Sequence, residues 1–122
     1  MKASHTLFPL IFVFLVQTAS SQKAPLLHLQ YEQNYTPTYY ETIELFRLLD
    51  RNYSNAILLE KGLTDSGKPL HLFIINNRKQ FDPQRIRQEG KVVLMINNGI
   101  HPGEPEGIDA CLQFADDILR NK

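Results

Sequence analysis

The spacing of apolar residues predicts a first helix from Tyr39 to Arg51. Apolar side chains recur there at intervals of three and four residues, which gives the segment one broad hydrophobic face. Thr38 lies directly before the segment and Glu41 lies three residues after Thr38, which is the pattern of a capping box. We therefore expect an amphipathic helix that begins at Tyr39 and packs on a core.

Two apolar runs after this helix predict a pair of strands. Residues 56–60 and 70–75 are rich in Ile, Leu and Phe, and the intervening residues 62–69 contain the turn formers Asp, Ser and Gly. The stretch 76–90 is polar, and the pattern predicts one short helical turn at 83–88 after a Pro at its first position. This region is expected to connect elements rather than to build the core.

Residues 91–97 form a short continuous apolar run, which is typical of a strand buried on both faces of a sheet. A second amphipathic helix is predicted from about Pro105 to Asn121, because apolar residues again recur at helical spacing. The predicted fold class is α/β: a partial mixed β-sheet with flanking helices. The other predicted elements are too few to cover both faces of the 91–97 strand.

The N-terminus differs from the rest of the chain. Lys2 precedes the apolar run Leu7 to Val16, and small residues follow at Ala19-Ser20-Ser21. Roughly ten apolar residues fall short of the about 20 that a membrane-spanning helix needs, so the pattern predicts a removed signal peptide at residues 1–21. We expect export to a periplasmic or extracellular location, followed by an irregular N-terminal lead-in at residues 22–38.

Composition narrows the class of protein without naming a function. The chain has 122 residues, of which 43% are hydrophobic and 21% charged, as in ordinary folded proteins. Thirteen basic residues balance thirteen acidic ones, so no charge excess favours nucleic acid or an anionic membrane as partner. The single cysteine, Cys111, excludes an internal disulfide and is expected to be a small buried side chain of the second helix.

The strongest candidates for chemistry are His101 and Glu104, between the predicted strand and the second helix. Open α/β sheets place their sites in such loops. Imidazole nitrogen and carboxylate oxygen are good zinc donors, and a tight turn brings residues three apart to one point. Gly99 and Gly103 allow the backbone angles that such a turn requires. The pair predicts two metal ligands, and neither helix-borne zinc signature occurs in the chain to supply a third.

The stretch Asn97-Asn98-Gly99-Ile100-His101-Pro102-Gly103-Glu104-Pro105-Glu106-Gly107 resembles the first zinc-binding motif of the M14 family of zinc metallocarboxypeptidases. In that family a Gly-Ile-His-x-x-Glu loop follows a central strand. The order of elements upstream, from about Tyr39, is similar as well. Gly103 is a departure, because digestive-type members carry a substrate-contacting arginine there. The resemblance implies that residues 39–122 are the N-terminal portion of an α/β/α carboxypeptidase-like catalytic domain.

By the same resemblance, His101 and Glu104 are two of three ligands of a catalytic Zn²⁺. The implied function is zinc-dependent proteolysis, the hydrolysis of C-terminal peptide bonds of peptides or proteins. The family's third ligand, a histidine, and its catalytic glutamate occur further along than residue 122. This chain alone is therefore expected to be inactive, and residues 22–122 expressed alone are expected to be prone to aggregation and to bind zinc weakly or not at all.

Two other interpretations stay open at the sequence level. One is a non-catalytic exported binding module in which His101 and Glu104 only cap the following helix, since a carboxylate is favoured at a helix start. The other is a degenerate peptidase-like protein that binds a peptide or a regulatory partner. His28 and His71 are possible substitute ligands, but their positions in the lead-in and in a strand indicate ordinary structural roles.

Overall fold

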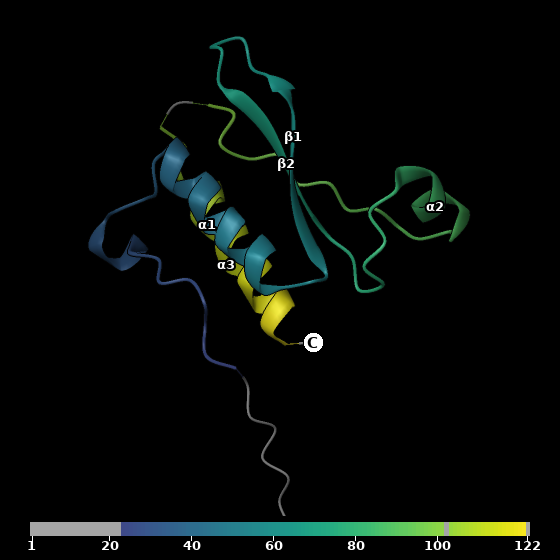
Figure 1. The fold of residues 1–122 in the computed structure, drawn as a ribbon. Helices are drawn as coiled ribbons and strands as arrows, with labels where there is room; N and C mark the ends of the chain where they lie inside the picture. The colour runs from purple at the N-terminus through teal and green to yellow at the C-terminus, as the bar shows by residue number, and fades with distance from the viewer. Residues whose placement is uncertain (1–22, 102, 122) are drawn as a thin grey trace, which may run out of the picture.

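The computed structural model describes residues 23–101 and 103–121. The predicted signal peptide, residues 1–21, lies outside this part of the chain. The elements follow one another as a 3-10 turn at Tyr31–Gln33, α1 at Tyr39–Asn52, β1 at Ala56–Leu63, β2 at Pro69–Ile75, α2 at Pro83–Gln88 and α3 at Glu106–Arg120. In Figure 1, α1 and α3 lie side by side along the β1–β2 hairpin, and α2 stands apart from them.

The start of α1 confirms the predicted capping pair. Glu41 Oε2 accepts hydrogen bonds from the Thr38 backbone N–H at 2.8 Å and from the Thr38 hydroxyl at 2.7 Å. Three hydrogen bonds, the third from the Tyr35 hydroxyl to Glu41 Oε1 at 2.7 Å, hold this carboxylate in place. They fix the helix start and tie the end of the lead-in to α1.

The sheet contains two antiparallel strands. The register pairs Ala56 with Ile75 and Glu60 with His71, and an irregularity follows between Glu60 and Leu63. Helices and a sheet in one small unit confirm the α/β class at a coarse level. Within the described residues the sheet has only the order β1–β2, so a larger mixed sheet is not seen.

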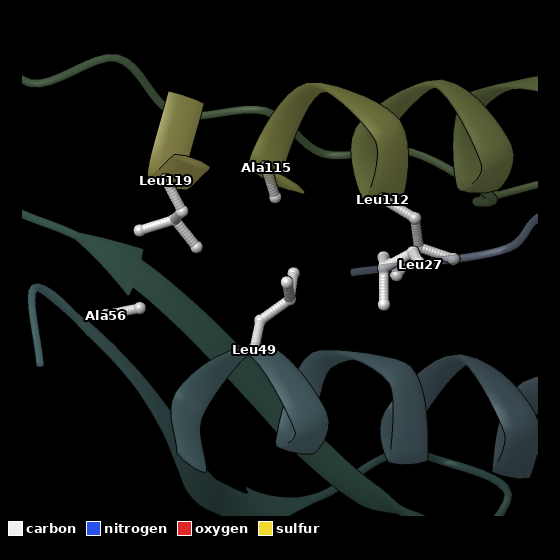
Figure 2. Close-up of a cluster of buried hydrophobic side chains, with 6 residues drawn as sticks. All are labelled: Leu27, Leu49, Ala56, Leu112, Ala115 and Leu119. Carbon is white, nitrogen blue, oxygen red and sulfur yellow. The ribbon is translucent and has the colours of Figure 1, made fainter. Parts of the chain in front are cut away.

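A small core joins the two long helices, the hairpin and the lead-in. Figure 2 shows its six buried side chains, of which Leu49 and Leu112 are fully enclosed between α1 and α3. Leu27 comes from the lead-in and is only 6% exposed. The complete set is Leu27, Leu49, Ala56, Leu112, Ala115 and Leu119.

The lead-in is packed against α3 rather than loosely extended. Asp116 is 2% exposed, and its Oδ2 accepts hydrogen bonds from the backbone N–H groups of Leu26 at 2.9 Å and Leu27 at 3.0 Å. Two turns earlier on α3, Asp109 Oδ2 accepts a 2.6 Å hydrogen bond from the Thr36 hydroxyl. Two carboxylates of α3 therefore fasten a segment to which the sequence pattern assigned no role.

The prediction of a doubly buried strand at residues 91–97 is wrong for this structure. The segment belongs to no strand, and Val92 and Met95 are 97% and 79% exposed. Among the described residues, 91–100 make no backbone-to-backbone hydrogen bond, and β2 pairs only with β1. A β-strand is held in a sheet by backbone hydrogen bonds to a neighbouring strand. Because no strand within the described ranges pairs with this segment, the side chains of Val92, Val93, Leu94 and Met95 are largely exposed.

None of the helices in the described ranges is both long enough and apolar enough to cross a lipid bilayer.

Candidate metal site

His101 and Glu104 lie in the loop between the extended segment 91–100 and the start of α3 at Glu106. One glycine on each side of His101 adopts a left-handed backbone conformation, Gly99 with φ of 62° and Gly103 with φ of 85°. Other residues adopt such angles only at an energetic cost, so these positions confirm the predicted need for glycine.

The loop is pressed onto the first turns of α3. A Cβ on Gly107 would lie 2.8 Å from Asn98 Cβ, and a Cβ on Gly99 would lie 3.3 Å from the Ile108 side chain. The Asn98 amide nitrogen also lies 2.7 Å from Cys111 Sγ. These close approaches fix where the loop leaves the extended segment and where it meets the helix.

The two predicted ligands are brought together. His101 Nδ1 lies 3.0 Å from Glu104 Oε2, and the side chains are 66% and 64% exposed. An exposed side-chain contact of this kind contributes at most about 1 kcal/mol to stability. The arrangement therefore does little for the fold, while it presents one nitrogen and one carboxylate to solvent from a constrained loop.

His101 Nδ1 and Glu104 Oε2 are in direct hydrogen-bond contact, so they lie slightly closer together than two ligands of one zinc ion. Donors that each lie about 2.0–2.2 Å from a tetrahedral zinc are about 3.3 Å apart, and a neutral imidazole and a carboxylate both belong to the usual donor set. The observed 3.0 Å separation is an ordinary hydrogen-bond length, so the two side chains would have to separate before both could bind one ion.

A third ligand is not found in the described part of the chain. There, no group of three or more His, Cys, Asp or Glu side chains is arranged to hold a metal ion. His28 and His71 therefore do not complete a site with His101 and Glu104. His71 is instead half-buried in β2, with its ring 6.3 Å from that of Tyr39.

The structure does not support a role for His101 or Glu104 as caps of α3. The residue at the N-cap position is Pro105, and no side-chain hydrogen bond caps this end of the helix. Glu106 and Asp109 supply the acidic side chains of the first turn. Asp109, however, is occupied by the Thr36 hydroxyl. His101 and Glu104 instead interact with each other.

Sequence reasoning missed how the loop is anchored. Cys111 was expected to be a buried hydrophobe, but it is only half-buried and lies against Asn98. The available signal was the glycine at position 107, on the face of α3 one turn before Cys111. A helical glycine indicates a close approach of another segment, although it does not identify that segment.

Comparisons with known proteins returned no match among family models, curated proteins or solved structures.

Proposed function

We propose that His101 and Glu104 are two of the three protein ligands of a catalytic zinc ion in a metallocarboxypeptidase-like enzyme. The observation that carries the proposal is the 3.0 Å separation of His101 Nδ1 and Glu104 Oε2 in an exposed, glycine-constrained loop. The similarity of residues 97–107 to the first zinc motif of the family supports the same assignment. The reaction is hydrolysis of the C-terminal peptide bond of a peptide or protein.

The residues of this loop have distinct tasks in that function. His101 presents Nδ1 and Glu104 presents a carboxylate oxygen to the metal, while Gly99 and Gly103 set the turn that aims both side chains to one side. The packing of Asn98 on Gly107 holds the loop relative to α3. When bound, zinc lowers the pKa of a water molecule and polarises the scissile carbonyl.

In this proposal the third metal ligand and the general base come from outside residues 23–121. A catalytic zinc site has three protein ligands and one position open to water, so one more ligand is required. A general base within hydrogen-bond reach of the water is also required. In this proposal His101 and Glu104 bind the metal, and residues outside 23–121 transfer the proton.

The activity is tested on the protein purified from its native source. We expect zinc-dependent release of the last residue from a peptide with a free C-terminal carboxylate and no release from the same peptide with an amidated C-terminus. His101→Ala introduced into the native gene is expected to lower kcat/KM at least about a thousandfold, since it removes a metal ligand. His28→Ala is the matched control and is expected to retain activity.

Equal cleavage of the free and amidated peptides would contradict a carboxypeptidase. Unchanged kcat/KM in His101→Ala would contradict the assignment of the ligand.

A non-catalytic exported binding module is the second candidate. It is favoured by the lack of a third ligand within the described ranges. This alternative predicts that the native protein hydrolyses neither peptide at any zinc concentration, so the same assay separates the two.

A further inference from the structure

Residues 76–91, which connect β2 to the extended segment, carry an excess of positive charge. They contain five basic and two acidic side chains, whereas the whole chain has thirteen of each sign. In Figure 1 this stretch, which contains α2, projects on the side of the hairpin away from α1 and α3. We call it the basic arm, and its basic residues are Arg78, Lys79, Arg85, Arg87 and Lys91.

Local hydrogen bonds give the basic arm a defined shape. The Asn76 side-chain amide donates to the Gln80 carbonyl oxygen at 2.6 Å. Asn76 Oδ1 accepts from the Arg78 N–H at 3.0 Å and from Lys91 Nζ at 2.8 Å. The Asp82 side chain caps the start of α2. Because the basic side chains project from an ordered backbone, less conformational entropy is lost when a partner binds.

The basic arm already binds one carboxylate of its own. Glu89 Oε2 lies 3.0 Å from Lys91 Nζ and 3.6 Å from Arg78 Nη1. The other basic residues of the arm, Lys79, Arg85 and Arg87, are exposed and take part in no ion pair within the described ranges. Three positive charges are therefore available to an anionic partner.

The available charges do not lie in one plane. Arg85 and Arg87 lie on opposite flanks of α2, because residues two apart on a helix are separated by about 200° around its axis. Ile86 between them is half-buried and lines an apolar cleft beside β2. A flexible chain can contact both flanks of α2 at once, whereas a flat surface can contact only one.

The basic arm lacks the side chains by which two other polyanions are bound. Phe81 and Ile86, its large apolar residues, are half-buried, so the arm exposes no such side chain that could enter a lipid surface. Proteins bind single-stranded nucleic acid by stacking its bases on aromatic side chains, and the arm has only Phe81. The carboxylates of an acidic polypeptide require neither feature.

We propose that the basic arm binds a flexible acidic polypeptide segment of a partner protein, whose carboxylates pair with Lys79, Arg85 and Arg87. The two arginines offer forked N–H donors that match the geometry of a carboxylate. The proposal goes beyond the proposed function and does not depend on zinc, because neither His101 nor Glu104 belongs to the arm.

The test measures the binding of a fluorescein-labelled peptide of eight glutamates to the protein from its native source, by fluorescence anisotropy. The C-terminus of the peptide is amidated, so that carboxypeptidase activity would not shorten it. The result is therefore independent of the proposed function.

A triple variant, Lys79→Asn, Arg85→Gln and Arg87→Gln, removes the three available charges. Asparagine suits the left-handed backbone of residue 79, with φ of 55°, and glutamine keeps the helix propensity of arginine. An exposed ion pair changes an affinity by about two- to threefold, so we expect the triple variant to bind the peptide about tenfold more weakly.

The matched control is the triple variant Lys23→Gln, Arg51→Gln and Lys61→Gln, which removes the same charge from exposed residues outside the arm. We expect its affinity to stay within about twofold of the wild type, since distant exposed charges are screened by salt. Equal weakening in the two triple variants would show that net charge alone attracts the peptide and would overturn the proposal. Absence of peptide binding to the wild type would overturn it as well.

Two other polyanions are compared with the peptide at the same salt concentration. One is a single-stranded DNA with eight phosphates, and the other is a vesicle that contains phosphatidylglycerol. We expect the wild type to bind the peptide more tightly than either. Equal or tighter binding of the DNA or the vesicle would overturn the assignment of an acidic polypeptide as the partner.

Discussion

At the scale of the residue, Gly107 controls the position of the candidate ligands. A methyl group at this position would lie 2.8 Å from Asn98 Cβ, which is closer than carbon atoms approach in packed structures. The loop that carries His101 and Glu104 would have to move away from α3. The site thus depends on a residue that cannot itself bind a metal.

We predict that Gly107→Ala destabilises the protein by about 1–3 kcal/mol, the usual cost of overpacking. This cost should exceed the gain in helix propensity, which is about 1 kcal/mol for the same change in an open helix. Urea unfolding measures the difference, with Gln113→Ala on the exposed face of α3 as control. A more stable Gly107→Ala variant would show that the loop does not rest on this turn.

Glu41 gives a prediction that depends on pH. Its pKa is held below the ordinary value because the Thr38 hydroxyl, the Tyr35 hydroxyl and the Thr38 N–H donate to the carboxylate. A carboxyl group with a lowered folded pKa stabilises the protein above its unfolded pKa, and the stabilisation is lost as pH falls through the folded pKa. The loss should therefore begin near the ordinary value of 4.5 and continue below it.

The measurement compares the free energy of unfolding of the wild type and Glu41→Gln at about pH 7 and about pH 3. We expect Glu41→Gln to be less stable at the higher pH and the difference to shrink in acid. Glu44→Gln serves as control, because it changes a carboxylate of the same helix whose partner within the described ranges is Arg47. A difference that stays constant across the two pH values would contradict this role of Glu41.

At the scale of the element, α3 organises the molecule. It contributes Leu112, Ala115 and Leu119 to the core, and its buried Asp116 binds the backbone of the lead-in. The same helix begins where the candidate metal loop ends. Any change that displaces α3 would therefore act on the core, the lead-in and the loop together.

Asp116→Ala tests how firmly the lead-in is held. We expect a loss of about 1.5–3 kcal/mol, because hydrogen bonds to a charged group are removed and two backbone N–H groups lose their acceptor. Hydrogen exchange at Leu26 and Leu27 should become faster. Asp117→Ala removes only a half-exposed partner of Arg120 and should change stability by no more than about 0.5 kcal/mol. Unchanged exchange at Leu26 in Asp116→Ala would contradict the contact.

The sequence predicts those elements whose signals are local. Helix α1, the hairpin strands, the turn α2 and helix α3 all lie within a few residues of their expected bounds, because capping residues, turn residues and hydrophobic spacing act over short distances. The contact between His101 and Glu104 was also predictable, since the two residues share one turn.

The features that the sequence did not predict correctly depend on partners far away in the chain. Asp116 is about 90 residues from the lead-in that it binds, and nothing in the local pattern indicates that pairing. The expected strand at 91–97 has the composition of a buried strand, but no neighbouring strand pairs with it in the described chain. An apolar run shows that a segment favours a buried strand, but the strand forms only where another strand pairs with it.

At the scale of the whole molecule, the apolar cleft beside β2 and the candidate metal loop share one segment. Most residues of 91–98 line the cleft, and the segment then leads into the loop of His101 and Glu104, which would supply two of the three ligands of the proposed zinc site. The proposed third ligand comes from outside residues 23–121, and a molecule completed with that ligand would close the metal site.

The central claim is that His101 and Glu104 bind zinc as a pair. The most direct measurement is a zinc titration of the protein from its native source, with its histidines labelled with ¹⁵N, followed by NMR of the imidazole nitrogens. We predict that zinc shifts the His101 Nδ1 resonance, and that this shift is lost in Glu104→Gln but not in Glu106→Gln. Zinc that shifts His28 or His71 while leaving His101 unchanged would contradict the claim.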